Sequence, residues 1–378
     1  MKDADILIGQ KVIGTMSKVF VVAEIGINHG GSAAQAEKLI DAAADAGADA
    51  VKFQSFRAEN LLIPSRDRYP QRLEGAESAY QVLRRCELSW PDQEKLKKHA
   101  DGRGVIFIST PFDPESVDFL DSLDVPAFKI ASSDITHVPL LRHVASKGKP
   151  VLLSTGMSFL NEVADAVWNL KSSGAKDILL MHCVSVNPAA PQDMNLRALQ
   201  TLQSYFELLV GLSDHSEGTL LPLVAVALGA VVIEKHFTLD KSAAGPDHKA
   251  SMDPQDLRLL IRNLRDVEAS LGDGRKRPSE AEEESRLFSR RSIVAASDIR
   301  VNETIEPWML TFKRPGTGLE PKYWEKVIGL TARRNIGKNT ILQWEDFVPS
   351  GALDSIRDAS NPEQEAALPR AHSKRHHA

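Results

Sequence analysis

The chain has little cysteine and no long apolar run. Its 378 residues include only Cys86 and Cys183, too few for a disulfide framework. No stretch approaches the roughly 18 consecutive apolar residues that a membrane-spanning helix needs. The first residues, MKDADILIGQKVIG, lack the basic start and apolar centre of a signal peptide. We therefore expect a cytoplasmic protein with no membrane partner.

The chain also has no excess of positive charge. The 46 lysines and arginines are outnumbered by 51 aspartates and glutamates, for a formal net charge of −5. This balance argues against nucleic acid as a partner. The length exceeds that of one ordinary domain, whereas a (β/α)₈ barrel uses about 250 residues and leaves room for a second, small module.

Short apolar runs alternate with helix-like segments through the first 271 residues. The runs begin near residues 19, 50, 105, 127, 151, 178, 208 and 231, and a helical pattern follows each one. Ser32 is placed to cap the first of these helices, and Gly47 to end it. Eight alternating strand–helix units predict an α/β fold, a TIM barrel over residues 1–271.

The remainder of the chain changes character twice. Residues 272–290 are charged and poor in apolar side chains, which is typical of a linker. Residues 291–349 hold short apolar pieces broken by turn residues, so we predict a small β-rich module. Residues 350–378 are polar and rich in alanine, and we expect a disordered tail there.

Two histidines close the last two apolar runs, in Ser213-Asp214-His215 and Glu234-Lys235-His236. A strand–helix–strand unit makes these strands parallel neighbours, and residues two apart in a strand share a face. The histidines should therefore lie together, beside a hydroxyl and a carboxylate, as a metal site with room for a substrate. The alternative is two unrelated polar residues that cap core strands.

Polar residues stand at the carboxyl end of every predicted strand. They are Glu24, Lys52, Gln54, Thr110, Lys129, Ser132, Ser154, Ser185, Ser213, His215, Glu234 and His236. In a TIM barrel these ends line one mouth, where active sites lie. Any single serine or threonine among them could be a strand cap. Buried lysines need an anionic partner, so Lys52 and Lys129 among hydroxyls suit a phosphate, alone or with a carboxylate. Together with two metal-binding histidines, such a site suits carbon–carbon bond formation between a phosphorylated enol and a polarised aldehyde.

A resemblance supports this interpretation. The ordered motifs AEIGINHGG, VKFQSF, STPFD, KIASSD, LSTGM, GLSDHSEG, VVIEKHFTLD, GPDHKAS and KRPGTG resemble the sialic acid synthase family from about residue 6 to 348. That family condenses phosphoenolpyruvate with an N-acetylated mannose-type sugar and water, giving a nine-carbon sialic-type acid such as N-acetylneuraminate, plus phosphate. The same chemistry on a 2,4-diacetamido-6-deoxy sugar gives a legionaminic-type acid. Residues 291–349 resemble the antifreeze-like SAF domain, which in the family covers the partner's barrel mouth in a domain-swapped homodimer.

The resemblance also implies residue roles. His215 and His236 ligate a divalent metal, often Mn²⁺, with Mg²⁺ or Co²⁺ as alternatives, and Glu24 is the acid/base candidate. The residues expected to hold phosphoenolpyruvate are Lys52, Thr110, Lys129, Ser132, Ser154 and Ser213. Those expected on the sugar side are Gln54, Asp134, Asp247 and Arg314, and Ser185, Asn187 and Glu234 complete the substrate-binding set. Family members commonly have tyrosine where this chain has Asn187, and several have glutamate where it has Asp134, so the departures lie on the sugar side.

Two other functions remain open at this point. A metal-dependent aldolase would form or cleave a keto acid without phosphoenolpyruvate, but it would not need two cationic anchors and four hydroxyls. A non-catalytic carbohydrate- or ice-binding protein would use residues 291–349. Such a protein would not need Glu24, His215 and His236 together.

Overall fold

The computed structural model describes residues 5–63 and 78–348. The chain divides into two compact units between Gly274 and Arg275. The expected disordered tail at 350–378 lies outside the described residues. Within the described part, no helix is both long and apolar enough to cross a membrane.

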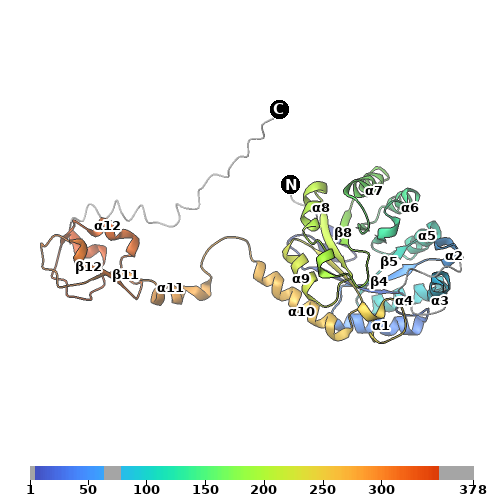
Figure 1. The fold of residues 1–378 in the computed structure, drawn as a ribbon, viewed down its shortest axis with the longest axis horizontal. Helices are drawn as coiled ribbons and strands as arrows, with labels where there is room; N and C mark the ends of the chain where they lie inside the picture. The colour runs from blue at the N-terminus through green and yellow to red at the C-terminus, as the bar shows by residue number, and fades with distance from the viewer. Residues whose placement is uncertain (1–4, 64–77, 349–378) are drawn as a thin grey trace, which may run out of the picture. The chain divides into compact units, whose positions relative to one another are not determined.

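The first unit is a closed barrel of eight parallel strands, as predicted (Figure 1). The strands are β3 Phe20–Gly26, β4 Ala50–Ser55, β5 Ile106–Pro111, β6 Phe128–Ile130, β7 Val151–Ser154, β8 Ile178–Cys183, β9 Leu209–Asp214 and β10 Val232–His236. They follow each other around the barrel in chain order, and β10 closes it by pairing with β3.

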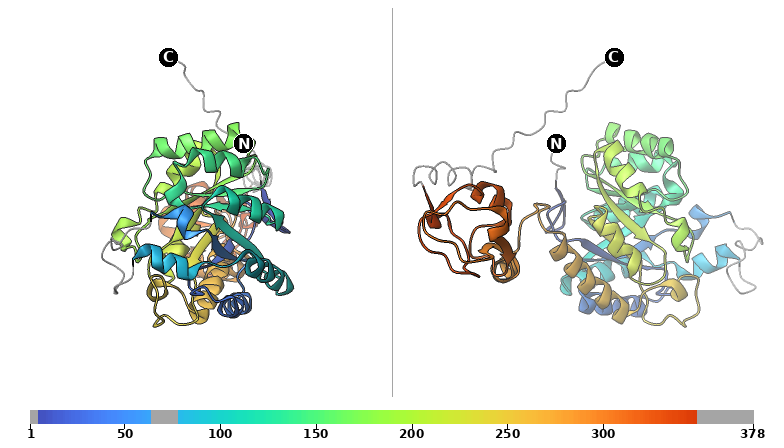
Figure 2. Two further views of the ribbon diagram at one scale, coloured as in Figure 1. Left: turned by 90° about the vertical axis from the view of Figure 1, so that its right-hand side faces the viewer. Right: turned by 60° about the vertical axis from the view of Figure 1, so that its left-hand side comes forward.

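Helices surround the barrel strands, and Figure 2 shows this outer layer from two further sides. They are α1 Ala33–Ala46, α2 Ala58–Leu61, α3 Ala79–Cys86, α4 Trp90–Gly102, α5 Pro114–Ser122, α6 Val138–Ala145, α7 Leu160–Ser172, α8 Ala198–Phe206, α9 Leu220–Ala227 and α10 Pro254–Leu271. The predicted ends of α1 are confirmed: the Ser32 side chain accepts a hydrogen bond from the Gln35 amide, and Gly47 takes a left-handed φ of 92°.

Alternation along each strand sorts its side chains between two apolar layers. On β3, Phe20 and Val22 belong to the cluster inside the barrel, whereas Val21 and Ala23 pack against the helices. The same alternation carries Glu24 to the inside. In every strand, alternate side chains point into the barrel up to the carboxyl end. Polar residues at those ends therefore face one another in the mouth.

A β-hairpin that the sequence analysis does not predict packs against the apolar cluster inside the barrel. Strands β1 Ile6–Ile8 and β2 Lys11–Ile13 pair antiparallel. Ile6, Ile8 and Ile13 are buried with the inner residues of the barrel. The hairpin thus adds apolar area to the cluster that includes Phe20, near the amino-terminal ends of the strands, and leaves the mouth free.

The second unit is small and rich in turns. Its elements are α11 Glu283–Ser289, β11 Ser292–Ala295, β12 Leu310–Lys313, α12 Trp324–Val327, β13 Thr331–Ala332 and β14 Phe347–Val348, in two antiparallel pairs. It has its own apolar core, which includes Ile293, Ile305 and Phe347. The helix α11 lies inside the stretch 272–290 that we read as a linker.

Candidate active site

A cavity of about 310 Å³ opens at the carboxyl ends of the barrel strands. The predicted site residues that line it are Glu24, Lys52, Gln54, Thr110, Lys129, Ser132, Ser154, Ser185, Asn187, Ser213, His215, Glu234, His236 and Asp247. The structure therefore gathers residues from all eight strands, and the loops that follow them, around one space. Such convergence at this end of a barrel is typical of an active site.

Lys52 lies between two carboxylates. Its Nζ is 2.9 Å from Glu24 Oε2 and 3.7 Å from Glu234 Oε1, and it donates to Thr110 Oγ1 at 3.2 Å. Gln54 donates to the other oxygen of Glu24 at 3.1 Å. Burial lowers the pKa of Lys52, but the charges of Glu234 and Glu24 outweigh it and hold the pKa above the ordinary lysine value. Lys52 is therefore charged.

Lys129 shares one of those carboxylates. Its Nζ donates to Glu234 Oε1 at 3.2 Å, and Ser213 donates to the same oxygen at 3.0 Å. Burial lowers the pKa of Lys129 below the ordinary value, because Glu234 opposes burial only in part and Lys52 repels it. Burial alone would raise the pKa of Glu234, but Lys129 and Lys52 lower it to about 2. From sequence we expected a ligand to supply the anion that these lysines need; the structure shows that the chain's own glutamates partner them.

The two predicted metal ligands lie side by side. The ring centroids of His215 and His236 are 5.3 Å apart. His215 Nδ1 lies 2.9 Å from the Val184 carbonyl, which makes it the donor and leaves Nε2 with a free lone pair. His236 Nδ1 is buried, has no hydrogen-bond partner among the described residues, and lies 4.0 Å from Asp247 Oδ2. Burial lowers the pKa of His236, so its ring is neutral at pH 7.

These features fit a divalent metal ion. A ligating histidine commonly donates its other ring N–H to a carbonyl or carboxylate, as His215 does to Val184. Neutral imidazole is the form that binds metal. In the described part of the chain, no three histidine, cysteine, aspartate or glutamate side chains converge on one point. A metal here would therefore take further ligands from water or substrate, as catalytic sites with open positions do.

Hydroxyl groups complete the cavity wall. Ser154 Oγ is buried and finds no hydrogen-bond partner within residues 5–63 and 78–348. Ser132 Oγ accepts from the Gly156 amide at 3.0 Å. Buried hydroxyls normally have a partner. Ser154 Oγ, like Glu234 Oε2 and His236 Nδ1 in the same cavity, is therefore available to a polar ligand.

Two predicted site residues are not part of this cavity wall. Asp134 accepts from Ser133 at 3.1 Å and lies 3.6 Å from His137 Nδ1. Burial raises the pKa of Asp134. Arg314 lies in the second unit. Their expected roles on the sugar side stay predictions.

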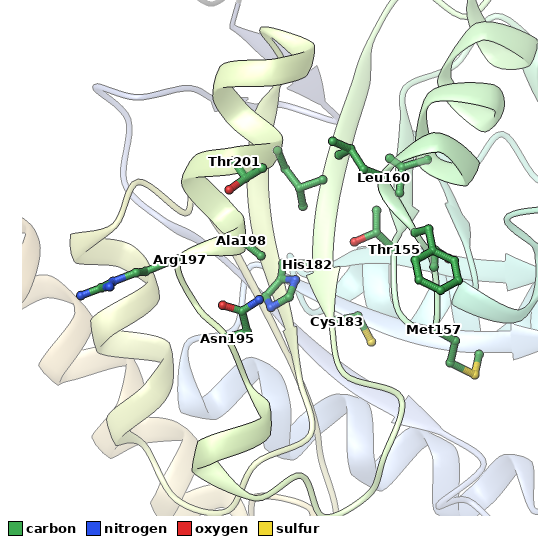
Figure 3. A pocket seen from close by; sticks show the side chains of 13 residues that line it. Thr155, Met157, Leu160, His182, Cys183, Asn195, Arg197, Ala198 and Thr201 are labelled. Atoms are coloured by element: carbon green, nitrogen blue, oxygen red, sulfur yellow. The ribbon is translucent and has the colours of Figure 1, made fainter.

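A second cavity, of about 500 Å³, lies beside the mouth between α7 and α8. Figure 3 shows Leu160 on one side of it and Ala198 and Thr201 on the other. Met157 and Cys183 line both this cavity and the mouth. Of the described residues that line it, none is a lysine, aspartate or glutamate. It therefore lacks the paired charges of the mouth, and we assign the chemistry to the smaller cavity.

Sequence reasoning missed several residues of the mouth. Phe112, Met157 and Cys183 line it, and Cys183 Sγ lies 3.7 Å from His215 Nδ1. A signal for Cys183 was present, because it is two residues after Met181 on the inward row of β8. On that row, the sequence predicts only Ser185, two residues further along.

Comparison with known proteins gives the family. A model described as the NeuB family matches residues 39–276, and one described as the SAF domain matches residues 290–348. The N,N'-diacetyllegionaminic acid synthase of Legionella pneumophila is 44% identical over 344 residues, covering 89% of this chain and 97% of that protein. The enzyme of the same name from Campylobacter jejuni is 42% identical over 333 residues, covering 87% of this chain and all of that protein.

A solved structure agrees. The crystal structure of N-acetylneuraminic acid (sialic acid) synthetase from Leptospira borgpetersenii superposes with a TM-score of 0.69 at 36% identity, covering 75% of this chain and 95% of that one. The resemblance read from the motifs is thereby confirmed. The chain belongs to the NeuB family and carries a C-terminal SAF domain.

Proposed function

We propose that this enzyme condenses phosphoenolpyruvate with an N-acetylated mannose-type sugar and water, giving a nine-carbon sialic-type acid and phosphate. The observation that carries the proposal is the single cavity in which Lys52 and Lys129 lie among hydroxyls beside His215 and His236. The two legionaminic acid synthases and the sialic acid synthetase named above support the same reaction class.

The net charge of the cavity explains why the lysine side of the site and the metal-binding histidine side are both needed. Glu24 and Glu234 pair with Lys52 and Lys129, and Asp247 lies 4.0 Å from His236 Nδ1. With both imidazoles in the neutral form that binds metal, the described lining carries one net negative charge. A trianionic donor such as phosphoenolpyruvate would be repelled by that lining. A divalent cation held by the two histidines reverses the sign, which favours binding of the donor.

The donor is assigned to the lysine side. Lys52, Thr110, Lys129, Ser132, Ser154 and Ser213 are the residues proposed to hold phosphoenolpyruvate. Ammonium groups and hydroxyls donate charge-assisted hydrogen bonds to phosphate and carboxylate oxygens. When the donor binds, its anionic oxygens satisfy Ser154 Oγ and share the lysines with Glu234.

Glu24 is proposed as the acid/base group. It lies opposite His236 in the strand pairing and forms an ion pair with Lys52, so it stands between the two halves of the site. Carbon 3 of phosphoenolpyruvate bonds to the aldehyde carbon of the sugar, whose oxygen takes up a proton. Water adds to the electron-poor carbon 2, and phosphate leaves with cleavage of its C–O bond. Glu24 moves the proton to or from these oxygens.

The metal proposal follows from the histidines. A divalent ion such as Mn²⁺, with Mg²⁺ or Co²⁺ as alternatives, would be held by His215 and His236 and would polarise the acceptor's aldehyde. Gln54, Ser185, Asn187 and Asp247 would face the acceptor. Asn187 Nδ2 donates to Asp247 Oδ1 at 3.1 Å, so these two residues form one polar wall beside His236.

One observation favours a particular acceptor. Two relatives that are 42% and 44% identical over nearly their whole length are N,N'-diacetyllegionaminic acid synthases. Their name implies a 2,4-diacetamido-6-deoxy acceptor. We therefore place this sugar first among the acceptors to be tested, with N-acetylmannosamine second.

The SAF domain is proposed to act between subunits. In a domain-swapped homodimer the SAF domain of one subunit would cover the mouth of the other, and Arg314 would reach the partner's sugar. The exposed apolar Phe288 and Trp308 in the second unit and Met157 and Phe159 beside the mouth suit such a contact.

One assay tests the reaction. The purified protein is incubated with phosphoenolpyruvate, Mn²⁺ and either sugar, and released phosphate and the keto acid product are measured together. Equal amounts of both are expected with at least one sugar. A parallel incubation contains pyruvate in place of phosphoenolpyruvate, and a keto acid formed there would indicate an aldolase. No product from either sugar, with tight sugar binding, would indicate a carbohydrate-binding protein.

A further inference from the structure

The residues beside the two histidines form an ion pair on the outer side of the barrel wall. Asp214 precedes His215, and Lys235 precedes His236. They sit opposite each other where β9 pairs with β10. Alternation directs the histidines into the mouth and this pair outward. Both are almost fully buried, with side chains 2% exposed for Lys235 and 0% for Asp214.

Lys235 binds the whole turn that carries His215. Its Nζ donates to Asp214 Oδ2 at 2.9 Å, to the Ser216 carbonyl at 2.5 Å and to the Gly218 carbonyl at 3.2 Å. Asp214 Oδ1 in turn accepts from the Ser216 amide at 2.9 Å. All three donors of the ammonium therefore hold residues 214–218 against β10, and the second oxygen of the carboxylate fixes the turn itself.

His215 is also held by the chain that follows β8, through both its backbone and its ring. Its carbonyl accepts from the Ala189 amide at 2.9 Å, and its Nδ1 lies 2.9 Å from the Val184 carbonyl. The contacts of Lys235 supply the side toward β10, which carries His236. Without them, residues 215–218 would keep their contacts to the chain after β8, and only the β9–β10 ladder up to Asp214 would connect them to the strand of His236.

We propose that Asp214 and Lys235 are positioning residues that set the separation of the His215 and His236 imidazoles. This inference rests on the proposed metal role of the two histidines. Outer partners of metal ligands act in this way by fixing ligand orientation before the metal binds. The pair does not touch the mouth cavity, so its effect must pass through the turn.

The test is Mn²⁺ affinity, measured on the full chain by the electron paramagnetic resonance of free Mn²⁺. Lys235→Met keeps the length of the side chain and removes its three donors. Because that variant leaves a buried carboxylate unpaired, a second variant combines Lys235→Met with Asp214→Asn, which keeps an acceptor for the Ser216 amide. Lys149→Met is the matched control, since Lys149 pairs with Asp121 and Asp124 before β7, at the opposite end of the barrel.

We expect the dissociation constant for Mn²⁺ to rise about 10- to 100-fold in both Lys235 variants and to stay unchanged in the control. Activity lost at limiting Mn²⁺ should return at high Mn²⁺, which a generally misfolded protein would not show. A folded double variant, checked by circular dichroism, that binds Mn²⁺ as tightly as the wild type overturns the inference. A wild type that binds no Mn²⁺ overturns the metal role itself, and this outcome is distinct from the first.

Discussion

Lys129 Nζ and Glu234 Oε1 lie 3.2 Å apart and join β6 to β10, which are opposite strands of the eight-stranded barrel. The contact crosses the lumen just below the mouth. Lys52 binds the same carboxylate from β4, so Glu234 stands between two ammonium groups. The floor of the site is therefore a closed ionic network rather than a positively charged well.

Replacement of Glu234 tests that network. Glu234→Gln keeps the shape and leaves two buried lysines with one carboxylate, Glu24. Because breaking a buried ion pair leaves an uncompensated charge, we expect a loss of about 3 kcal/mol in the free energy of unfolding. Ser213→Ala removes one hydrogen bond to the same oxygen and should cost about 1 kcal/mol. Urea unfolding at pH 7 measures both, and equal losses would contradict the network.

Removal of a metal ligand should stop turnover and spare the fold. We expect His236→Ala to lose at least about 1000-fold in kcat, because the acceptor aldehyde is no longer polarised. The far-ultraviolet circular dichroism should match that of the wild type. His143→Ala is the control, since His143 pairs with Asp118 on the outer helices. Wild-type enzyme that keeps full activity in excess chelator would refute the metal role.

His29 predicts how stability depends on pH. The residue is 3% exposed, and burial lowers the pKa of its imidazole from 6.5 to about 4. The unfolded chain therefore binds a proton that the folded chain excludes between these values. The stabilisation is fully present above pH 6.5 and is lost as the pH falls toward 4, by at most about 3 kcal/mol.

The measurement compares the wild type with His29→Asn, whose amide oxygen can still accept from the Gly31 amide, as His29 Nδ1 does. Between pH 7.5 and pH 5 the wild type should lose about 2 kcal/mol more in the free energy of unfolding than the variant. Carboxylates contribute to both proteins alike, so the difference reports on His29. Parallel pH profiles would show that folding leaves the pKa of His29 unchanged.

Arg314 tests whether subunits share a site. Arg314→Ala should raise the KM of the sugar about tenfold and leave that of phosphoenolpyruvate nearly unchanged, as loss of one charged contact to the acceptor would. Coexpression with His236→Ala then gives mixed dimers in which one mouth has both intact residues. The mixture is assayed at a sugar concentration far below the KM, where Arg314→Ala alone keeps about a tenth of wild-type activity. If Arg314 acts across subunits, the mixture should then show about a quarter of wild-type activity. No recovery would place Arg314 on its own barrel or outside the site.

Much of the fold could be predicted because its signals are local. Each of these signals depends on residues close by in the sequence. They are the apolar runs of strand length, the helix-like periods between them, the Ser32 cap and the helix end at Gly47. The same alternation predicted that Glu24, His215 and His236 would meet in one mouth, since parallel strands in a barrel present their carboxyl ends together. The hairpin at residues 6–13 escaped prediction because its partners are side chains inside a barrel that closes only later in the chain.

The pairings of charged residues were decided by tertiary structure alone. From sequence, Lys52 and Lys129 called for an anion, and nothing local identified it. Closure of the barrel brings Glu234 to Lys129 from 105 residues away in the chain, and alternation turns Lys235 outward to Asp214. The sequence determines which side chains lie at the mouth, because strand period and order are local. The tertiary structure determines which of these charged groups form ion pairs, because the Coulomb energy depends on their distances across the closed barrel.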